Sequence, residues 1–208
     1  MSKLARVVET AIMLADSGVT KLPPSVLAIK GHGSKKVSIF LNALCCQIHD
    51  CRYLEMGTFA GRSLAAAAWG NTGVYMGVDK LQWLGSTVSF DSTEHLKEEL
   101  KSSLRLCASS NVGVIESDFR LFKPEFDAYD VFFYDADHGY EATRDGTAMM
   151  LPYLKPGVLI MDDYHSHAKS SLVQQGMLEA LAGAKVEKSW ELTPKRGWHT
   201  GIYVAVIG

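Results

Sequence analysis

The sequence lacks the features that mark several specialised classes of protein. It contains no run of lysines or arginines, and its 21 basic and 23 acidic residues leave a formal net charge of −2. This balance argues against a dedicated nucleic-acid-binding protein, which carries a basic patch. No apolar stretch is long enough to span a bilayer, and Glu9 and Asp16 interrupt the region where a signal peptide would be apolar. We therefore expect a cytoplasmic protein with neither nucleic acid nor a membrane as its partner.

Cysteine is also scarce. The four cysteines are Cys45, Cys46, Cys51 and Cys107, and none of them form a C-x-x-C pair. This spacing gives no indication of a zinc site. The apolar surroundings predict that all four are reduced cysteines of the core.

The first 50 residues show helical patterns. Apolar residues recur at helical spacing over 4–15, and the pattern stops at Ser17-Gly18. Pro23 and Pro24 predict a turn, and Ser34 is placed to cap a second helix that runs to about Ile48. We expect residues 1–50 to form an N-terminal helical cap and 51–208 the main domain, with both in one structural unit.

From residue 51 onwards, strand and helix patterns alternate. The predicted strands are Arg52–Met56, Val74–Asp79, Val112–Glu116, Asp130–Asp135, Val158–Asp162, Val186–Leu192 and Gly201–Val206. Apolar strands that alternate with helices predict a parallel sheet covered on both faces. No helix separates the last two strands, so they should form an antiparallel hairpin. The prediction is an α/β fold with a Rossmann-like, seven-stranded, mostly parallel sheet.

Carboxylates recur where the predicted parallel strands end. They are Glu55, Asp79, Asp118, Asp135, Asp162 and Asp163. Ligands of open parallel sheets bind beyond the carboxyl ends of the strands, so these acids should meet at one edge. A single Asp at a strand end can also cap a helix or form a turn, and that ordinary interpretation stays open for Asp118.

The first strand is followed by a glycine loop. Gly57 allows a sharp turn, and Gly61 would let the backbone approach a ligand at the start of a helix. The spacing is G-x-x-x-G and not the G-x-G-x-x-G of dinucleotide-binding proteins, which disfavours an NAD-linked oxidoreductase. The acids would repel a pyrophosphate and suit a cationic ligand, and Asp79 is placed to accept hydrogen bonds from ribose hydroxyls.

These residues resemble the motifs of class I S-adenosylmethionine (SAM) dependent methyltransferases. The similar segments are 53–63, 77–79 and 116–119, and the resemblance extends from Arg52 to the C-terminus. It implies that SAM is the cofactor. The residues that would bind it are Glu55, Gly57, Thr58, Gly61, Ser63, Asp79, Asp118, Phe119 and Asp135.

Two later segments, 134–143 and 154–164, are similar to a subgroup of metal-dependent O-methyltransferases. That subgroup methylates sugar or phenolic hydroxyls and includes macrolide and aminocoumarin tailoring enzymes. The resemblance implies that Asp135, Asp162 and Asp163 bind a divalent metal, Mg²⁺, and that Asp137 or His138 is the general base. It also implies a hydroxylated small molecule as the substrate. A homodimer is our expectation for the quaternary structure.

Two alternatives remain open from the sequence. Asp135 would contact only the cofactor if Asp162 and Asp163 served to cap the next helix. The chain would also fit a catalytically silent module that binds SAM or a partner without turnover, because a motif indicates capacity and not activity. A base-modifying enzyme is disfavoured, since Asp135-Ala136-Asp137-His138 stands where such enzymes have a Pro-Pro-aromatic turn.

Overall fold

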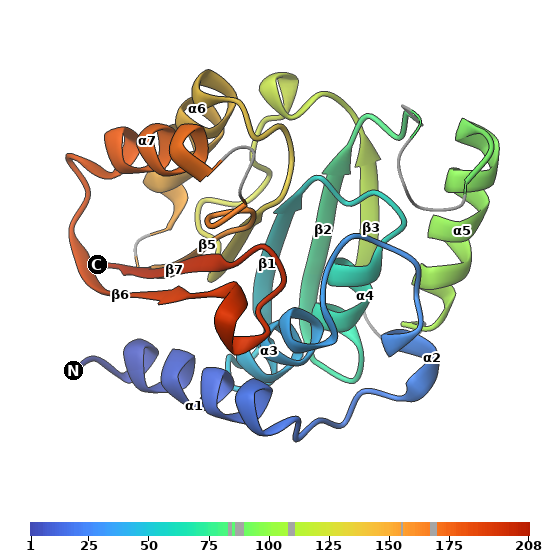
Figure 1. The fold of residues 1–208 in the computed structure, drawn as a ribbon, viewed down its shortest axis with the longest axis horizontal. Coiled ribbons are helices and arrows are strands. Elements are labelled where there is room, and N and C mark those ends of the chain that lie inside the picture. Colours follow the sequence, from blue (N-terminus) through green and yellow to red (C-terminus); the bar gives the residue numbers. More distant parts are fainter. Residues whose placement is uncertain (83–84, 86–89, 108–110, 155, 167–169) are drawn as a thin grey trace.

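A seven-stranded sheet runs through the centre of the molecule, with helices on both faces (Figure 1). The structure is a computed structural model, and it describes residues 1–82, 85, 90–107, 111–154, 156–166 and 170–208. No helix of the described residues is long and apolar enough to cross a membrane.

The sheet has the predicted mixture of parallel and antiparallel strands. Its order is β3-β2-β1-β4-β5-β7-β6, and neighbours from β3 to β5 are parallel, whereas β7 is antiparallel to both β5 and β6. The strands are β1 (Cys51–Met56), β2 (Gly73–Asp79), β3 (Asn111–Glu116), β4 (Val131–Tyr134), β5 (Gly157–Met161), β6 (Val186–Leu192) and β7 (Ile202–Ile207). The predicted Rossmann-like fold and its C-terminal hairpin are confirmed.

Alternate strand residues pack on opposite faces of this sheet. Val131 and Phe133 belong to one core cluster, whereas Phe132 and Tyr134 belong to another. Both faces of β4 are therefore apolar, as expected where helices cover a sheet on both sides. The first cluster includes residues of α1 (Lys3–Ser17), α3 (Lys35–Cys46) and α4 (Arg62–Ala68), and the second includes residues of α6 (Tyr140–Met150) and α7 (Ser170–Leu181).

The remaining helical segments are short, except for α5 (Thr93–Arg105). They are α2 (Pro24–Leu27), η1 (Phe119–Leu121), η2 (Leu151–Tyr153) and η3 (Pro194–Arg196). The sequence predicted only a turn at the paired prolines, but Pro24 begins α2. Proline is tolerated in the first turn of a helix because its missing N–H would have no partner there.

The N-terminal helices begin and end at the predicted signals. The Ser34 side chain accepts a hydrogen bond from Val37 N and so caps α3, and Gly18 ends α1 in the left-handed conformation. The prediction for the cysteines is confirmed for Cys45, Cys51 and Cys107, but it is wrong for Cys46, which is exposed at the last position of α3.

The strand order reverses at the centre of the sheet. The chain moves outward from β1 to β2 and β3, and then returns to place β4 on the other side of β1. Loops at the carboxyl ends of β1 and β4 therefore diverge and leave a crevice between them, which is where open α/β sheets bind ligands.

Candidate functional site

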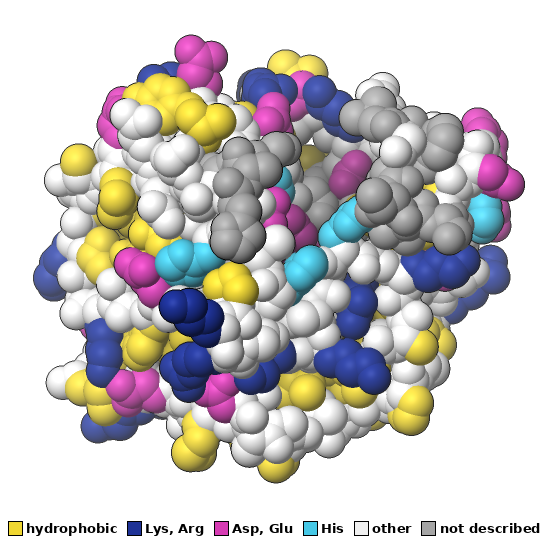
Figure 2. Space-filling view, in the orientation of Figure 1, with side chains coloured by type: hydrophobic (Ala, Val, Ile, Leu, Met, Phe, Trp, Pro, Cys, Tyr) yellow, Lys and Arg dark blue, Asp and Glu magenta, His cyan; other side chains and the backbone are white. Residues whose placement is uncertain are grey.

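A cavity of about 740 Å³ opens at the carboxyl ends of β1, β2, β4 and β5. The loops after these strands line it, together with residues 30–34 and the start of α3. Figure 2 shows a hollow in this face with acidic and histidine side chains in it and basic side chains below it. A cavity of this size accommodates a small molecule and a cofactor.

Gly57 holds the loop after β1 against the two neighbouring strands. Its N–H donates to the carbonyl of Val78 at the end of β2, and its φ is 93°. A Cβ at this position would lie 2.1 Å from the carbonyl oxygen of Asp135, after β4. Only glycine fits this combination of positive φ and close backbone approach.

Gly61 makes a close contact that the sequence did not predict. It is the residue before α4 and has a φ of 83°, so the left-handed turn is present. A Cβ there would lie 2.8 Å from Leu100 Cδ1 on α5, and Gly61 does not line the cavity. The glycine therefore allows α5 to pack closely.

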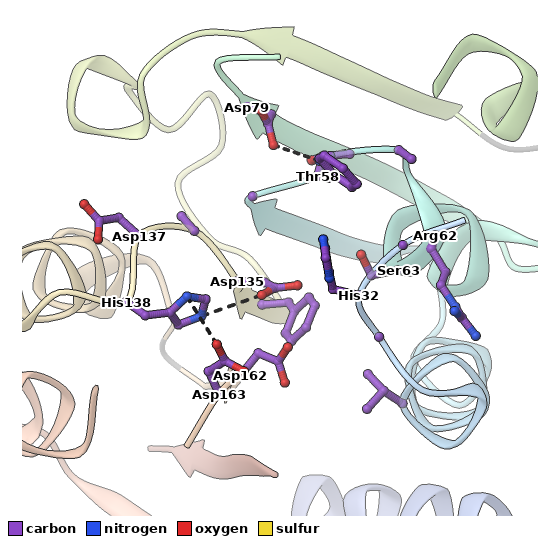
Figure 3. Close-up of a pocket in the computed structure, with 18 of the residues that line it drawn as sticks. His32, Thr58, Arg62, Ser63, Asp79, Asp135, Asp137, His138, Asp162 and Asp163 are labelled. Atoms are coloured by element: carbon purple, nitrogen blue, oxygen red, sulfur yellow. Dashed lines mark hydrogen bonds and ion pairs between the residues drawn. The ribbon is translucent and has the colours of Figure 1, made fainter. Parts of the chain in front are cut away.

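Asp79 holds the loop after β1 and the loop after β2 in place. Its carboxylate accepts hydrogen bonds from the backbone N–H groups of Phe59, at 2.8 Å, and Leu81, at 2.6 Å. Figure 3 shows the side chain of Asp79 at the cavity beside Thr58. Each carboxylate oxygen can accept more than one hydrogen bond, so Asp79 retains the capacity to bind two vicinal hydroxyls.

Glu55 lies beneath the cavity and is fully buried. The Tyr53 hydroxyl donates to its Oε2 at 2.7 Å. Burial raises the pKa of Glu55 to about 7, although hydrogen bonds from Tyr53, Ser63 and Thr58 oppose the shift. A cation bound above this carboxylate would stabilise its charged form.

Three carboxylates and a histidine meet at the ends of β4 and β5 (Figure 3). His138 Nε2 lies 3.7 Å from Asp135 Oδ1, and His138 Nδ1 lies 3.5 Å from Asp163 Oδ2. Asp162 is buried, and its Oδ1 has no hydrogen-bond partner among the residues that the structure describes. Asp163 has a φ of 55°, which is strained for a residue other than glycine and is often found at functional sites.

The crowding of these acids changes their protonation. Burial raises the pKa of Asp135 well above its ordinary value, and the charges of Asp162, Glu55 and Asp163 raise it further. Burial and the charge of Asp163 raise the pKa of Asp162 to about 7. Within the described ranges, however, no three acidic, histidine or cysteine side chains are arranged around one point as metal ligands would be.

Asp137 points away from this cluster, as Figure 3 shows. Its Oδ1 accepts a hydrogen bond from Gly139 N at the start of α6, and its Oδ2 lies 3.2 Å from Arg120 Nη2. Arg120 also pairs with Asp118, which in turn pairs with Lys80. This series of ion pairs joins the loops that follow β2, β3 and β4.

The cavity brings together most of the residues predicted from the sequence. Those that line it are Gly57, Thr58, Ser63, Asp79, Phe119, Asp135, Asp137, His138, Asp162 and Asp163. Glu55 and Gly61 lie behind its wall, and Asp118 lines a separate shallow hollow beside it. The sequence prediction missed Arg62 and Thr200, which also line the cavity. Arg62 stands within the glycine motif, but no sequence signal indicates Thr200.

Comparison with known proteins places this geometry in context. Residues 54–164 match the family described as methyltransferase domain, and the segment contains the glycine loop, Asp79 and the acid cluster. A search of curated proteins finds no match.

Several solved structures share the fold. The O-methyltransferase TomG from Streptomyces achromogenes, involved in tomaymycin synthesis and solved with SAM, has a TM-score of 0.59 at 18% identity, over 100% of this chain and 99% of TomG. A putative O-methyltransferase from Klebsiella pneumoniae has a TM-score of 0.59 at 19% identity, over 99% of this chain and 89% of that one. An O-methyltransferase from Bacillus cereus, solved with S-adenosylhomocysteine (SAH), has a TM-score of 0.55 at 17% identity, over 98% and 91%.

Proposed function

Because the chain belongs to the methyltransferase domain family, we propose that it transfers the methyl group of SAM to a hydroxyl oxygen of a small molecule. The observation that carries this proposal is the arrangement of His138 between Asp135 and Asp163 at the edge of a cavity that also contains Asp79. The O-methyltransferase names of TomG and the Bacillus cereus protein support the choice of oxygen as the acceptor atom.

The proposed cofactor position follows the strand ends. Asp79 would accept hydrogen bonds from the ribose hydroxyls, and Gly57, Thr58 and Ser63 would surround the amino-acid part. Asp135 and the buried Glu55 would face the cationic groups of SAM, which a pair of carboxylates attracts. Bound SAM supplies a methyl carbon attached to a positively charged sulfonium sulfur. When the methyl group is transferred, this sulfur becomes the uncharged thioether sulfur of SAH, the leaving group.

We assign the role of general base to His138 and not to Asp137. Both ring nitrogens of His138 lie near carboxylates at the cavity, whereas the carboxylate of Asp137 is held by Arg120 and by Gly139 N. His138 would accept the hydroxyl proton as the acceptor oxygen forms its bond to the methyl carbon and the carbon–sulfur bond breaks. Asp135 and Asp163 would stabilise the imidazolium that results, as in other carboxylate–histidine pairs.

The donor chemistry of the acid cluster fits Mg²⁺. The ion prefers carboxylate oxygens, and Asp162 Oδ1 is buried without a partner among the described residues. The mutual repulsion of the acids also favours a cation beside them. Asp135, Asp162 and Asp163 would hold the ion, and bound Mg²⁺ would supply a Lewis acid that lowers the pKa of the acceptor hydroxyl.

The proposal is tested by SAH formation from SAM with a panel of catechols, phenols and sugars, in the presence and absence of EDTA. Loss of the base lowers a rate by roughly 10²–10⁴-fold, so we expect His138→Gln to lose activity on this scale while its affinity for SAM stays unchanged. Asp137→Asn is the matched comparison and should retain most of the activity.

Full activity in His138→Gln would exclude His138 as the base. SAM binding without SAH formation from any acceptor would instead support a module that binds the cofactor without turnover. A rate that EDTA leaves unchanged would contradict the proposed role of Mg²⁺.

A further inference from the structure

The wall of the cavity on the N-terminal side carries positive charge without matching acids. Lys30 and Arg62 supply this charge, and both line the cavity. In Figure 3, Arg62 lies on the opposite side of the cavity from His138 and Asp137. Across the part of the chain that the structure describes, no acidic side chain forms an ion pair with Lys30 or Arg62.

Arg62 is only partly exposed, and its surroundings leave it incompletely bonded. Its Nε is sealed from solvent and has no hydrogen-bond partner among the described residues, and its Nη2 reaches the carbonyl of Leu27 only at 3.5 Å. Burial lowers the pKa of Arg62, but a guanidinium stays protonated in proteins. A partly buried cation without a counter-ion is costly, so the site favours an anion that it would pair with.

This anion is better supplied by the acceptor than by the cofactor. The Arg62 side chain packs on segment 27–31, since a Cβ on Gly31 would lie 3.2 Å from Arg62 Cβ and Nη2 points to Leu27. That segment lies outside residues 54–164, which match the family, whereas Arg62 itself lies within them. The strand-end acids suit the sulfonium and ammonium groups of SAM. The carboxylate of SAM is the competing anion for Arg62, and the titration below distinguishes the two.

We propose that Arg62, with Lys30 also lining the cavity, binds an anionic oxygen group of the methyl acceptor, either a carboxylate or a phosphate. The planar fork of Arg62 suits a two-point contact with such a group, and Lys30 is exposed and adds a second positive charge. The inference rests on the proposed function, because it requires SAM or SAH to occupy the strand-end side of the cavity.

The probe is inorganic phosphate, titrated into SAH-loaded protein and followed by its ³¹P signal. The SAH affinity of every variant is measured first, so that a failure of cofactor binding is recognised as a failure of the proposed function. We expect phosphate to bind the wild-type complex, and Arg62→Gln to weaken this binding at least about tenfold, the effect of losing one charge-assisted contact. Arg62→Lys should retain part of the affinity.

Arg105→Gln is the matched control, because Arg105 is an exposed arginine at the end of α5, outside the cavity. It should bind phosphate as the wild type does. If Arg62→Gln does not fold, Lys30→Gln provides the second test, with an expected loss of a few-fold.

Three results would overturn the inference: no phosphate binding to the wild-type complex, equal binding in Arg62→Gln, or phosphate binding that SAH abolishes. The last result would mean that Arg62 binds the carboxylate of the cofactor.

Discussion

The two sides of the cavity are built on different physical principles. The loop after β1 is fixed by backbone contacts: Gly57 donates to Val78, and the N–H of Phe59 donates to Asp79. At the ends of β4 and β5, by contrast, Asp135, Asp162 and Asp163 are brought together against their mutual repulsion. The loop after β1 depends on shape, whereas the acid cluster at the ends of β4 and β5 depends on charge and should respond to protons and cations.

Gly57→Ala should have the largest effect, because it breaks the contact between the two sides. The added Cβ would lie 2.1 Å from the Asp135 carbonyl oxygen at a positive φ. We expect a loss of about 3 kcal/mol or more in the free energy of unfolding, together with loss of SAM binding. Denaturant titration measures the first effect and calorimetry the second.

Gly113→Ala is the control for this prediction. Gly113 is an exposed position of β3 with no heavy atom within 4 Å of a Cβ. Its unfolding free energy should change by less than about 1 kcal/mol. Equal stability of the two variants would contradict the account of the fixed loop.

Asp79→Asn tests the shape-dependent side through a single carboxylate. The variant retains the size of the side chain but weakens the acceptor for Phe59 N, Leu81 N and the proposed ribose hydroxyls. We expect SAM affinity to fall by roughly 10- to 100-fold, since hydrogen bonds to charged groups contribute about 1.5–3 kcal/mol. Asp145→Asn on the exposed face of α6 should leave the affinity unchanged.

Glu55→Gln should give a smaller effect that depends on pH. The pKa of Glu55 is about 7 in the folded protein and 4.5 in its ordinary state. Glu55 therefore contributes stability that is fully present below pH 4.5 and is lost as the pH rises through 7. The melting temperature of the variant minus that of the wild type should therefore be larger at pH 8 than at pH 4.5.

Saturating SAM should reduce this advantage at pH 8, because the cationic ligand stabilises the charged form of Glu55. The comparison uses thermal unfolding at both pH values with and without SAM. A difference between variant and wild type that is the same at both pH values would contradict the raised pKa.

The fold follows from patterns within the sequence, whereas parts of the site depend on contacts between distant segments. Apolar runs and turn residues were sufficient to predict all seven strands, because both faces of each central strand are buried. The contact of Gly61 with Leu100 was not predicted, because Leu100 lies on α5, far along the sequence. The sequence left Asp137 and His138 both open as the base, because the pairing of Asp137 with Arg120 is not visible in either local motif.

The acid cluster illustrates the same limit of prediction from the sequence. The sequence places Asp135, Asp162 and Asp163 at strand ends, but the position of His138 between two of them depends on the turns after β4 and β5. Asp163 takes a positive φ that no residue pattern indicates. Arg62 was missed because its lack of an acidic partner is a property of the folded chain.

The central claim is tested most directly by calorimetric titration of the purified protein with SAM, with and without Mg²⁺, beside the Asp79→Asn variant. We predict binding by the wild type and clearly weaker binding by the variant in both metal conditions. Absence of SAM binding by the wild type, with and without Mg²⁺, would contradict the account.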